Sequence, residues 1–443
     1  MPDSQNLLIE NARFPTSEGM RKINLLVQDG RVAALGETLS VPDVPRLDAA
    51  ESYLLPGFVD VHTNGAAGFD FSYGLYDLQS RTFDGSRDAY FRGLERAANF
   101  YLQQGATTVL LTTIAAPVEN LERAFRFFAE FKRHSALADV FGGIYIEGSF
   151  IADPHFAGAH NPKYFLSPSY SLVHRWQELA EGGIRVVNLP PEHGQVALDL
   201  IPRLTEMGIL TVAGHSGAYF DEFEAAVQKG LRGAVHLFNG PMRSFYKSFR
   251  GGGAFEAALS LRPVFAELIC DFYHVAPQYL RDAIFRKTPE RILAVTDSMF
   301  VTGIEKIDTF RISQMEGSVS ANGGYLQVKG KPGTLFGSVL TMKRAFENLV
   351  ALLAEGGPGV WREYHPALPF EKALFQAVQM TSLTPHLFLK KTPLVLRPGA
   401  PADFVLADIQ KTGNSVKIAL RHIFKNGRAV ATRELPKINP KTD

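Results

Sequence analysis

Eight short apolar runs, separated by longer polar or amphipathic segments, constrain the fold of this chain more than any other feature. The runs are residues 54–61, 106–114, 140–146, 184–189, 209–213, 233–235, 265–271 and 291–296. Each run reads as a buried strand, and several of the segments between them have the apolar spacing of helices. Eight βα units of this kind predict a parallel TIM (β/α)8 barrel of the α/β class. In such a barrel, catalytic side chains lie at the C-terminal ends of the strands.

The segments between the runs contain helix signals of the expected kind. Residues 87–104 form one predicted helix, and residues 219–229 form a shorter one that Gly230 ends. The apolar stripe of the first helix consists of Phe91, Leu94, Ala98 and Tyr101. After the eighth run, residues 300–337 read as a loop, and Ser338 is the predicted N-cap of a long helix.

Short strands joined by turn residues occur at both ends of the chain. Asp29-Gly30 separates two of them near the N-terminus, and Asn426-Gly427 separates two near the C-terminus. We therefore predict a small β-sandwich domain built from residues 1–54 and 395–443, with a structural role. The barrel, and with it the chemistry, is predicted to occupy residues 55–394.

Composition narrows the class of function. The net charge of +1 over 443 residues gives no electrostatic basis for binding nucleic acid or an anionic membrane. No apolar run has membrane-spanning length, and the N-terminus lacks a secretory pattern, so the predicted location is cytoplasmic. The single cysteine, Cys270, lies in an apolar run and is predicted to be a buried small hydrophobe.

Three potential metal ligands follow three of the predicted strands. Glu147 ends the third run, His215 follows the fifth, and His236 follows the sixth. A histidine at the end of a strand is, taken alone, more often structural, so the prediction depends on the joint placement. Two imidazoles and one carboxylate leave an open position for water, as catalytic zinc sites require.

Two further strand ends complete the predicted site. Asp297 ends the eighth run, where its carboxylate is predicted to act as a general base rather than as a helix cap. His62 ends the first run and is a possible second-metal ligand or a residue supporting the ligands. The residue two positions later is Asn64, a poor transition-metal ligand, so one divalent metal per chain is expected. The ligand set fits zinc, with iron or cobalt as alternatives.

Several motifs together resemble one known family. They lie at residues 56–62, 146–148, 158–162, 213–216, 236–239, 271–275, 295–297 and 335–342. In this order, and over nearly the whole chain, they are similar to the N-acetylglucosamine-6-phosphate deacetylases of the amidohydrolase superfamily. Members of that family are metal-dependent, usually homodimeric, and release acetate from the 2-acetamido group of a phosphorylated amino sugar.

The resemblance implies roles for individual residues of this chain. It supports Glu147, His215 and His236 as the metal ligands and Asp297 as the catalytic acid/base. The implied substrate contacts are Ala159, His160, Asn239, Gly240, His274, Leu335, Phe336 and Gly337. The implied reaction removes the acetyl group of N-acetylglucosamine 6-phosphate to give glucosamine 6-phosphate and acetate.

The chain departs from the family pattern at three places. Residues 239–242 read Asn-Gly-Pro-Met where the family commonly has Asn-Ala-Met. In the family, an arginine in the segment that corresponds to residues 247–252 binds the sugar phosphate across the dimer. Here Arg250 is the candidate for this role and Arg243 the reserve, with Lys247 nearby. Residues 271–273 read Asp-Phe-Tyr in place of the usual Asp-Gly, which predicts an aromatic side chain near the pocket.

Two alternatives remain open at this stage. A related amidohydrolase could act on another N-acyl or cyclic amide, although such enzymes more often have a second histidine at the position of Asn64. A barrel of this kind could also bind a sugar without hydrolysing it. Acetate release from N-acetylated amino sugars, with and without a 6-phosphate, separates these alternatives.

Overall fold

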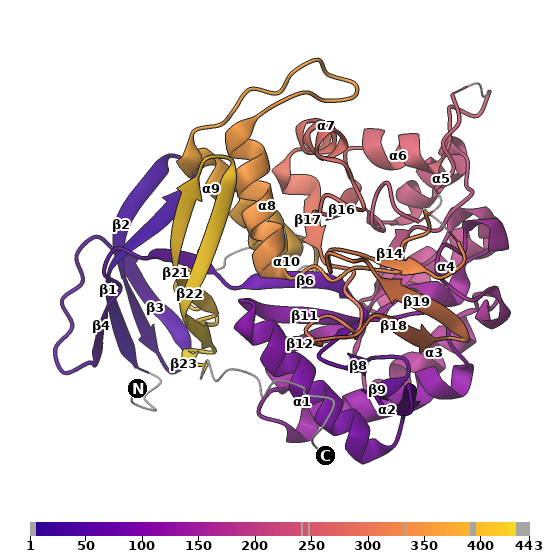
Figure 1. The fold of residues 1–443 in the computed structure, drawn as a ribbon, viewed down its shortest axis with the longest axis horizontal. Coiled ribbons are helices and arrows are strands. Elements are labelled where there is room, and N and C mark those ends of the chain that lie inside the picture. The colour runs from indigo at the N-terminus through magenta and orange to yellow at the C-terminus, as the bar shows by residue number, and fades with distance from the viewer. Residues whose placement is uncertain (1–5, 241, 247–248, 332, 390–395, 431–443) are drawn as a thin grey trace.

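The computed structural model describes residues 6–240, 242–246, 249–331, 333–389 and 396–430. The predicted domain boundaries at residues 1, 395 and 443 lie outside these ranges and stay predictions. Figure 1 shows the strands of the two chain ends, in indigo and yellow, to one side of a larger barrel. Within the described residues, we find no helix that combines the length and the apolar character needed to span a bilayer.

The eight predicted runs form the barrel sheet, so the TIM barrel prediction is confirmed. Its strands pair in the order β17-β16-β15-β14-β13-β12-β11-β6, all parallel. In chain order they are β6 (Phe58–Thr63), β11 (Ala106–Thr113), β12 (Phe141–Ile146), β13 (Ile184–Asn188), β14 (Leu210–Ala213), β15 (Gly233–Ala234), β16 (Phe265–Ile269) and β17 (Ile292–Val295).

Side chains help to close the barrel where its first and last strands meet. Buried Asp60, on β6, accepts hydrogen bonds from the Thr296 hydroxyl at 2.5 Å and from the Thr296 backbone N–H at 3.3 Å. The backbone N–H of Asp297 donates to the carbonyl of His62 at 2.9 Å. These bonds connect the end of β17 to β6, which brings Asp297 beside His62.

Helices surround the barrel strands, as the alternation predicts (Figure 1). They are α1 (Arg87–Gln103), α2 (Val118–His134), α3 (Tyr170–Leu179), α4 (Gln195–Glu206), α5 (Phe220–Lys229), α6 (Ala254–Ser260), α7 (Pro277–Lys287), α8 (Met342–Glu355), α9 (Phe370–Val378) and α10 (Thr384–Phe388), with a π-helical turn, η7 (Gln379–Leu383), before α10. Leu94, Ala98 and Tyr101 of the predicted stripe are buried in α1. Cys270 is free and fully buried, as predicted.

The predicted N-cap at Ser338 is wrong. Helix α8 begins at Met342, and the hydroxyl of Thr341 caps it by accepting from the backbone N–H of Arg344. Ser338 instead donates through its hydroxyl to the carbonyl of Thr296 at 2.5 Å, and its backbone N–H donates to the carbonyl of Asp297 at 2.8 Å. The residue therefore attaches the preceding loop to the end of β17.

The two chain ends meet in one eight-stranded sheet, as predicted. It contains β1 (Leu7–Thr16), β2 (Gly19–Gln28), β3 (Arg31–Gly36), β4 (Arg46–Asp48), β5 (Tyr53–Pro56), β21 (Phe404–Thr412), β22 (Ser415–Lys425) and β23 (Arg428–Ala429). The first apolar run divides at Gly57, because β5 pairs with β21 while β6 enters the barrel. A Cβ at Gly57 would lie 2.1 Å from the Thr107 hydroxyl oxygen, so only glycine fits at this crossing.

Two small antiparallel sheets extend from the barrel. One contains β7 (Gly65–Ala66), β8 (Phe69–Asp70), β9 (Gly74–Asp77) and β10 (Thr82–Asp84), and the other contains β18 (Thr309–Ile312), β19 (Met315–Val319) and β20 (Leu326–Val328). The prediction that residues 300–337 form only a loop is therefore wrong. Short strands between glycine-rich turns resemble a loop in sequence, but Phe300, Phe310 and Phe336 give this insert a buried core.

Candidate active site

A pocket of about 670 Å³ opens beyond the C-terminal ends of the barrel strands. The predicted site residues that line it are Glu147, Ala159, His160, His215, His236, Asn239, Gly240, His274, Asp297, Leu335, Phe336 and Gly337. His62 is fully buried next to Glu147, whereas Arg250 is not part of the lining. The strand-end residues among them, Glu147, His215, His236 and Asp297, lie up to 150 positions apart in the chain and meet at this pocket.

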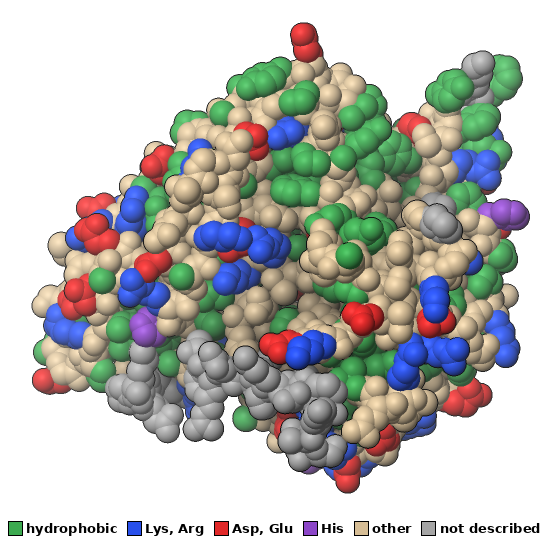
Figure 2. Space-filling view, in the orientation of Figure 1, with side chains coloured by type: hydrophobic (Ala, Val, Ile, Leu, Met, Phe, Trp, Pro, Cys, Tyr) green, Lys and Arg blue, Asp and Glu red, His purple; other side chains and the backbone are tan. Residues whose placement is uncertain are grey.

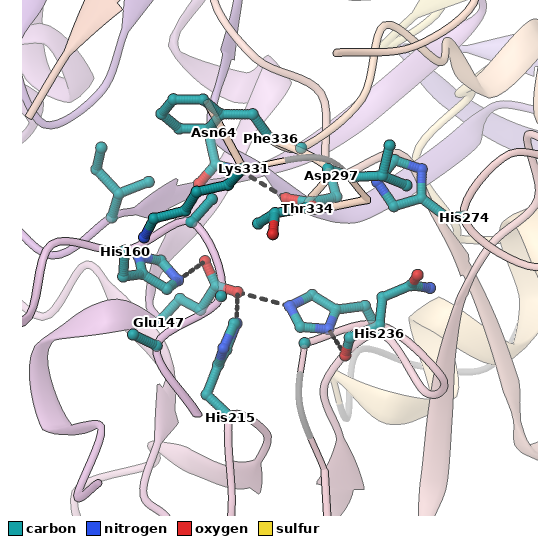
Figure 3. Close-up of a pocket in the computed structure, with 18 of the residues that line it drawn as sticks. Asn64, Glu147, His160, His215, His236, His274, Asp297, Lys331, Thr334 and Phe336 are labelled. Atoms are coloured by element: carbon teal, nitrogen blue, oxygen red, sulfur yellow. Dashed lines mark hydrogen bonds and ion pairs between the residues drawn. The ribbon is translucent and has the colours of Figure 1, made fainter. Parts of the chain in front are cut away.

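Glu147 contacts four imidazoles, and Figure 3 shows three of them, those of His160, His215 and His236. It follows β12, and its Oε1 lies 2.8 Å from His236 Nε2, 3.4 Å from His215 Nε2 and 3.5 Å from His62 Nε2. Its Oε2 lies 3.4 Å from His160 Nε2. All five side chains are at least nine-tenths buried, so bulk water does not screen these interactions.

Hydrogen bonds at Nδ1 define the tautomers of three of these histidines. His215 Nδ1 lies 2.8 Å from the carbonyl of Phe156, and His236 Nδ1 lies 2.7 Å from the carbonyl of Asn239. His62 Nδ1 lies 2.8 Å from Glu267 Oε2. Each partner can only accept, so Nδ1 carries the proton and the neutral ring has its lone pair on Nε2. All three lone pairs then face the Glu147 carboxylate.

This arrangement fits a metal ion. Nitrogen lone pairs and carboxylate oxygens at 2.8 to 3.5 Å repel one another unless a cation lies among them. Two groups of side chains, His62–Glu147–His236 and Glu147–His160–His215, have ligand atoms within 4.8 Å of one another. Of the predicted ligands, Glu147 belongs to both groups, His236 to the first and His215 to the second.

His160 presents a hydrogen-bond donor rather than a lone pair. The backbone N–H of Ala115 donates to His160 Nδ1 at 3.3 Å, so the proton of the neutral ring is on Nε2, which faces Glu147. A Cβ at Gly148 would lie 2.7 Å from His160 Nδ1, so any larger residue at this position would displace the imidazole ring. His160 is therefore suited to a substrate or carboxylate contact more than to metal ligation, and its role as a substrate contact stays a prediction.

The pKa shifts agree with a carboxylate that attracts cations. Burial alone would raise the pKa of Glu147, but the charges of His62 and His160 hold it well below its usual value. Burial lowers the pKa of His215 to about 4, so this imidazole is neutral at pH 7, the form that binds a metal. His62 shows the opposite shift, because the charges of Glu147 and Glu267 outweigh burial and raise its pKa well above the usual value. Without a metal, a proton on Nε2 is therefore the cation that this carboxylate cluster attracts, and the lone pair is present only in the neutral ring.

Asp297 is held beside this cluster by Asn64. The Asn64 amide donates to Asp297 Oδ1 at 2.7 Å, and the same oxygen lies 3.5 Å from His62 Nε2. Burial, with the nearby charge of Glu147, raises the pKa of Asp297 above its usual value despite the opposing effect of His62. Asn64 thus contacts the proposed base, at the position where a second histidine would have supplied another imidazole.

Three of the strand-end residues have unusual backbone geometry. The φ angles of His215, His236 and Asp297 are 51°, 23° and 49°. Non-glycine residues in this region cost on the order of 1 kcal/mol or more each, and such residues cluster at functional sites. The strained positions coincide with two proposed ligands and the proposed base.

Two buried residues of the site escaped the sequence prediction. Glu267 is the only charged residue in the apolar strand β16, which is the signal that could have identified it. Asn188, at the end of β13, donates through its amide to the carbonyls of Glu147 and Gly214 and accepts from the Gly214 N–H. It therefore connects the ends of β12 and β14, which carry one proposed ligand each.

Comparison with known proteins assigns the family. No protein-family model matches the chain. An N-acetylgalactosamine-6-phosphate deacetylase of Escherichia coli O157:H7 is 30% identical over 400 residues, which cover 89% of this chain and 93% of that protein. The chain belongs to the amino-sugar-6-phosphate deacetylase family that includes the N-acetylglucosamine-6-phosphate deacetylases.

Other relatives agree with this assignment. An N-acetylglucosamine-6-phosphate deacetylase of Lysinibacillus sphaericus is 29% identical over 346 residues, or 78% of this chain and 83% of that protein. The structure of a mutant Mycobacterium smegmatis N-acetyl-D-glucosamine-6-phosphate deacetylase, in complex with N-acetyl-D-glucosamine-6-phosphate, matches 96% of this chain and 99% of that chain with a TM-score of 0.77 at 28% identity. A dihydroorotase matches with a TM-score of 0.52 at 13% identity, which shows the fold alone.

The departure from the deacetylase family at residues 271–273 has a structural consequence. Phe272 has a φ of 68°, in the region that favours the glycine usual in the family. Tyr273 lines the pocket, as predicted, and its hydroxyl accepts from the Asn322 amide at 3.1 Å. Beside it, His274 Nδ1 donates to Asp271 Oδ2 at 2.6 Å. The loop after β16 is therefore attached to the insert of β18 to β20.

The predicted phosphate-binding arginine lies away from the pocket of its own chain. Arg250 pairs with Asp221 and with Glu222, each at 2.9 Å, and is partly exposed. Arg243, the reserve, donates to the carbonyl of Gly217 at 2.6 Å and also does not line the pocket. Lys247 and Pro241 lie outside the described residues.

We predict that Gly240→Ala weakens metal binding while the protein stays folded. A Cβ at Gly240 would lie 2.8 Å from His236 Cε1 and 2.9 Å from His215 Cε1, so it would displace both rings. Displaced ligands should lower the affinity for Zn²⁺ by about tenfold or more. Competition with a chelating dye measures this affinity.

Gly208→Ala is the matched control for this substitution. Gly208 has a φ of 75°, close to the 65° of Gly240, but a Cβ there would meet nothing within 4 Å. The control therefore carries the same backbone strain without the contact. Equal Zn²⁺ affinity in Gly240→Ala and the wild type would contradict the geometry described here.

Proposed function

We propose that this protein hydrolyses the acetamide of an N-acetylated amino sugar 6-phosphate, in the first instance N-acetylglucosamine 6-phosphate, to give glucosamine 6-phosphate and acetate. The observation that carries the proposal is the set of three imidazole lone pairs facing Glu147, beside the buried carboxylate of Asp297. The names of the relatives support the substrate class, because they include deacetylases of both N-acetylglucosamine and N-acetylgalactosamine 6-phosphates.

Glu147, His215 and His236 are the proposed ligands of one divalent metal. Zinc is the first candidate, with iron or cobalt as alternatives, because mixed imidazole and carboxylate sets accept all three. When bound, the ion would act as a Lewis acid on the acetamide carbonyl and on the attacking water. His62 faces the same carboxylate and is proposed to support the ligands.

Asp297 is the proposed acid/base. Its raised pKa lies closer to neutral pH, which suits a group that both accepts and returns a proton. It takes a proton from the attacking water as the new C–O bond forms, and delivers it to the nitrogen as the C–N bond breaks. The leaving group is then an amine rather than an amide anion. The hydrogen bond from Asn64 orients Oδ1 and leaves Oδ2 for this exchange.

A 6-phosphate requires a cation, and the pocket offers one within the chain. Of the described residues that line the pocket, Lys331 is the only lysine or arginine. Figure 3 shows it extending over His160 from the loop that also carries Thr334 and Phe336. We propose Lys331 as the partner of the phosphate and keep Arg250 as a candidate that acts from a second subunit. The other predicted substrate contacts stay proposals.

A homodimer is also proposed. Phe245, Tyr246 and Phe249 are 40%, 90% and 111% exposed on the segment between β15 and α6. Tyr279 on α7 and Trp361 are 38% and 52% exposed. Figure 2 shows hydrophobic side chains on the projecting segment at the upper right and on the upper face near α6 and α7. Exposed aromatic surface of this kind favours a subunit interface. The cytoplasmic location stays a prediction.

We predict that Asp297→Asn lowers kcat for acetate release at least a hundredfold without loss of metal. The amide keeps the size of the side chain but cannot accept the proton, and general acid–base catalysis contributes about 100- to 10,000-fold. Elemental analysis of the same preparation provides the control. Near-normal turnover in a metal-replete variant would remove Asp297 from this role, and no acetate release by the wild type would favour the non-catalytic alternative.

We predict that Lys331→Met raises KM for the 6-phosphorylated sugar by about 10- to 100-fold, the range expected for a charge-assisted hydrogen bond. KM for the unphosphorylated sugar should barely change. Lys329→Met is the matched control, because Lys329 pairs with Glu316 at 3.1 Å on the same loop and does not line the pocket.

Arg250→Ala distinguishes the two candidates for the phosphate. If Arg250→Ala raises KM selectively and Lys331→Met does not, the phosphate is bound by Arg250, acting across the dimer. Equal losses on both substrates in the Lys331 variant would mean that this residue supports the loop rather than the phosphate. A wild type that prefers the unphosphorylated sugar would contradict the proposed substrate.

A further inference from the structure

Glu267 is an ionisable residue in the middle of a buried strand. It lies on β16, where all five residues are buried, and its own side chain is 1% exposed. A carboxylate in such an environment is costly unless its oxygens are hydrogen-bonded. No lysine or arginine pairs with it among the described residues, so its partners must explain its presence.

Both hydrogen-bond partners of the Glu267 carboxylate belong to the histidine cluster and contact Oε2, whereas Oε1 is buried without a partner among the described residues. Oε2 accepts from His62 Nδ1 at 2.8 Å and from the backbone N–H of His236 at 3.1 Å. One oxygen therefore contacts two of the histidines that face Glu147. This oxygen accepts from the side chain of His62 and from the backbone of His236.

The hydrogen bond between Glu267 and His62 determines whether the other ring nitrogen of His62, Nε2, is a donor or an acceptor. Because Nδ1–H donates to Glu267, Nε2 of the neutral ring has the lone pair. That atom is fully buried, has no hydrogen-bond partner among the described residues, and lies 3.5 Å from both Glu147 Oε1 and Asp297 Oδ1. A buried nitrogen facing two carboxylate oxygens needs a cation, which is a proton on Nε2 in the metal-free protein and a metal ion in the loaded one.

The bond to His236 affects the position of a second ring. His236 follows the two-residue strand β15 and has a φ of 23°. Its backbone N–H would otherwise be a buried donor, which costs about 1 to 3 kcal/mol when unpaired. The Glu267 carboxylate satisfies this donor and so helps to keep the strained strand end that places His236 Nε2 2.8 Å from Glu147 Oε1.

We propose that Glu267 is a positioning residue for the divalent metal centre. Through His62 it fixes the ring that faces the proposed ligand Glu147, and through the backbone of the proposed ligand His236 it holds the end of β15. The inference depends on the proposed metal-dependent function. Carboxylates behind ligand histidines orient the ring and raise its basicity, and their loss typically costs 10- to 100-fold in metal affinity.

The alternative is a buried polar pair that serves only the stability of the barrel. The chain contains a matched example outside the pocket. Asp282 Oδ1 lies 2.7 Å from His365 Nε2, and both residues are buried. Asp282 also accepts from the backbone N–H groups of Val360 and Trp361. Asp282→Asn therefore shows what the loss of a carboxylate–histidine pair does when no metal is involved.

The test measures Zn²⁺ affinity by competition with a chelating dye, together with the melting temperature of the metal-free protein. Glu267→Leu removes both hydrogen bonds at similar volume and should weaken Zn²⁺ binding about 10- to 100-fold. Glu267→Gln retains an oxygen that can accept from both groups, while it loses the charge and puts an amide NH2 in place of Oε1, so its loss of affinity should be smaller. Asp282→Asn should lower the melting temperature and leave Zn²⁺ affinity unchanged.

The outcomes separate this inference from the proposed function. Wild-type affinity in both Glu267 variants overturns the positioning role, even if their melting temperatures fall. If Glu267→Leu does not fold, wild-type affinity in Glu267→Gln alone overturns it. A wild-type protein that binds no divalent metal overturns the proposed function, and the positioning role with it.

Discussion

The site depends on the interaction between the Glu147 carboxylate and the imidazole lone pairs that face it. Acceptors this close are stable together only with a cation among them. Each lone pair is fixed by an acceptor at the opposite ring nitrogen. The acceptor is local for His236, the Asn239 carbonyl, and distant in the chain for His215 and His62, the Phe156 carbonyl and the Glu267 carboxylate. The whole barrel is therefore needed to assemble a centre that no local motif could form.

Much of this arrangement could be predicted from the sequence. Buried parallel strands leave a clear pattern of apolar runs, and the strand-end rule then placed Glu147, His215 and Asp297 at one pocket. The tautomers of His62 and His215 could not be predicted, because they depend on hydrogen bonds to residues distant in the chain. The hydrogen bond from Asn64 to Asp297 could not be predicted either, because it joins the first and last barrel strands and local periodicity carries no information about such a pair.

Other features were missed or mistaken for the same physical reason. Ser338 has the residue type of a helix cap, but its bonds to β17 determine its place, and Thr341 caps the helix instead. The insert of β18 to β20 reads as a loop because its strands are short, although three phenylalanines give it a core. Lys331 could not be identified as a candidate from the sequence, because only the folded insert brings it to the pocket (Figure 3).

The central claim is that one divalent metal is bound where the lone pairs converge. Anomalous X-ray diffraction, measured on both sides of the absorption edge of the metal, tests this most directly on crystals grown without added metal. We predict a single peak in contact with Glu147, His215 and His236. A peak elsewhere, or none in crystals of active protein, would contradict the claim, and two adjacent peaks would contradict the single metal inferred from Asn64.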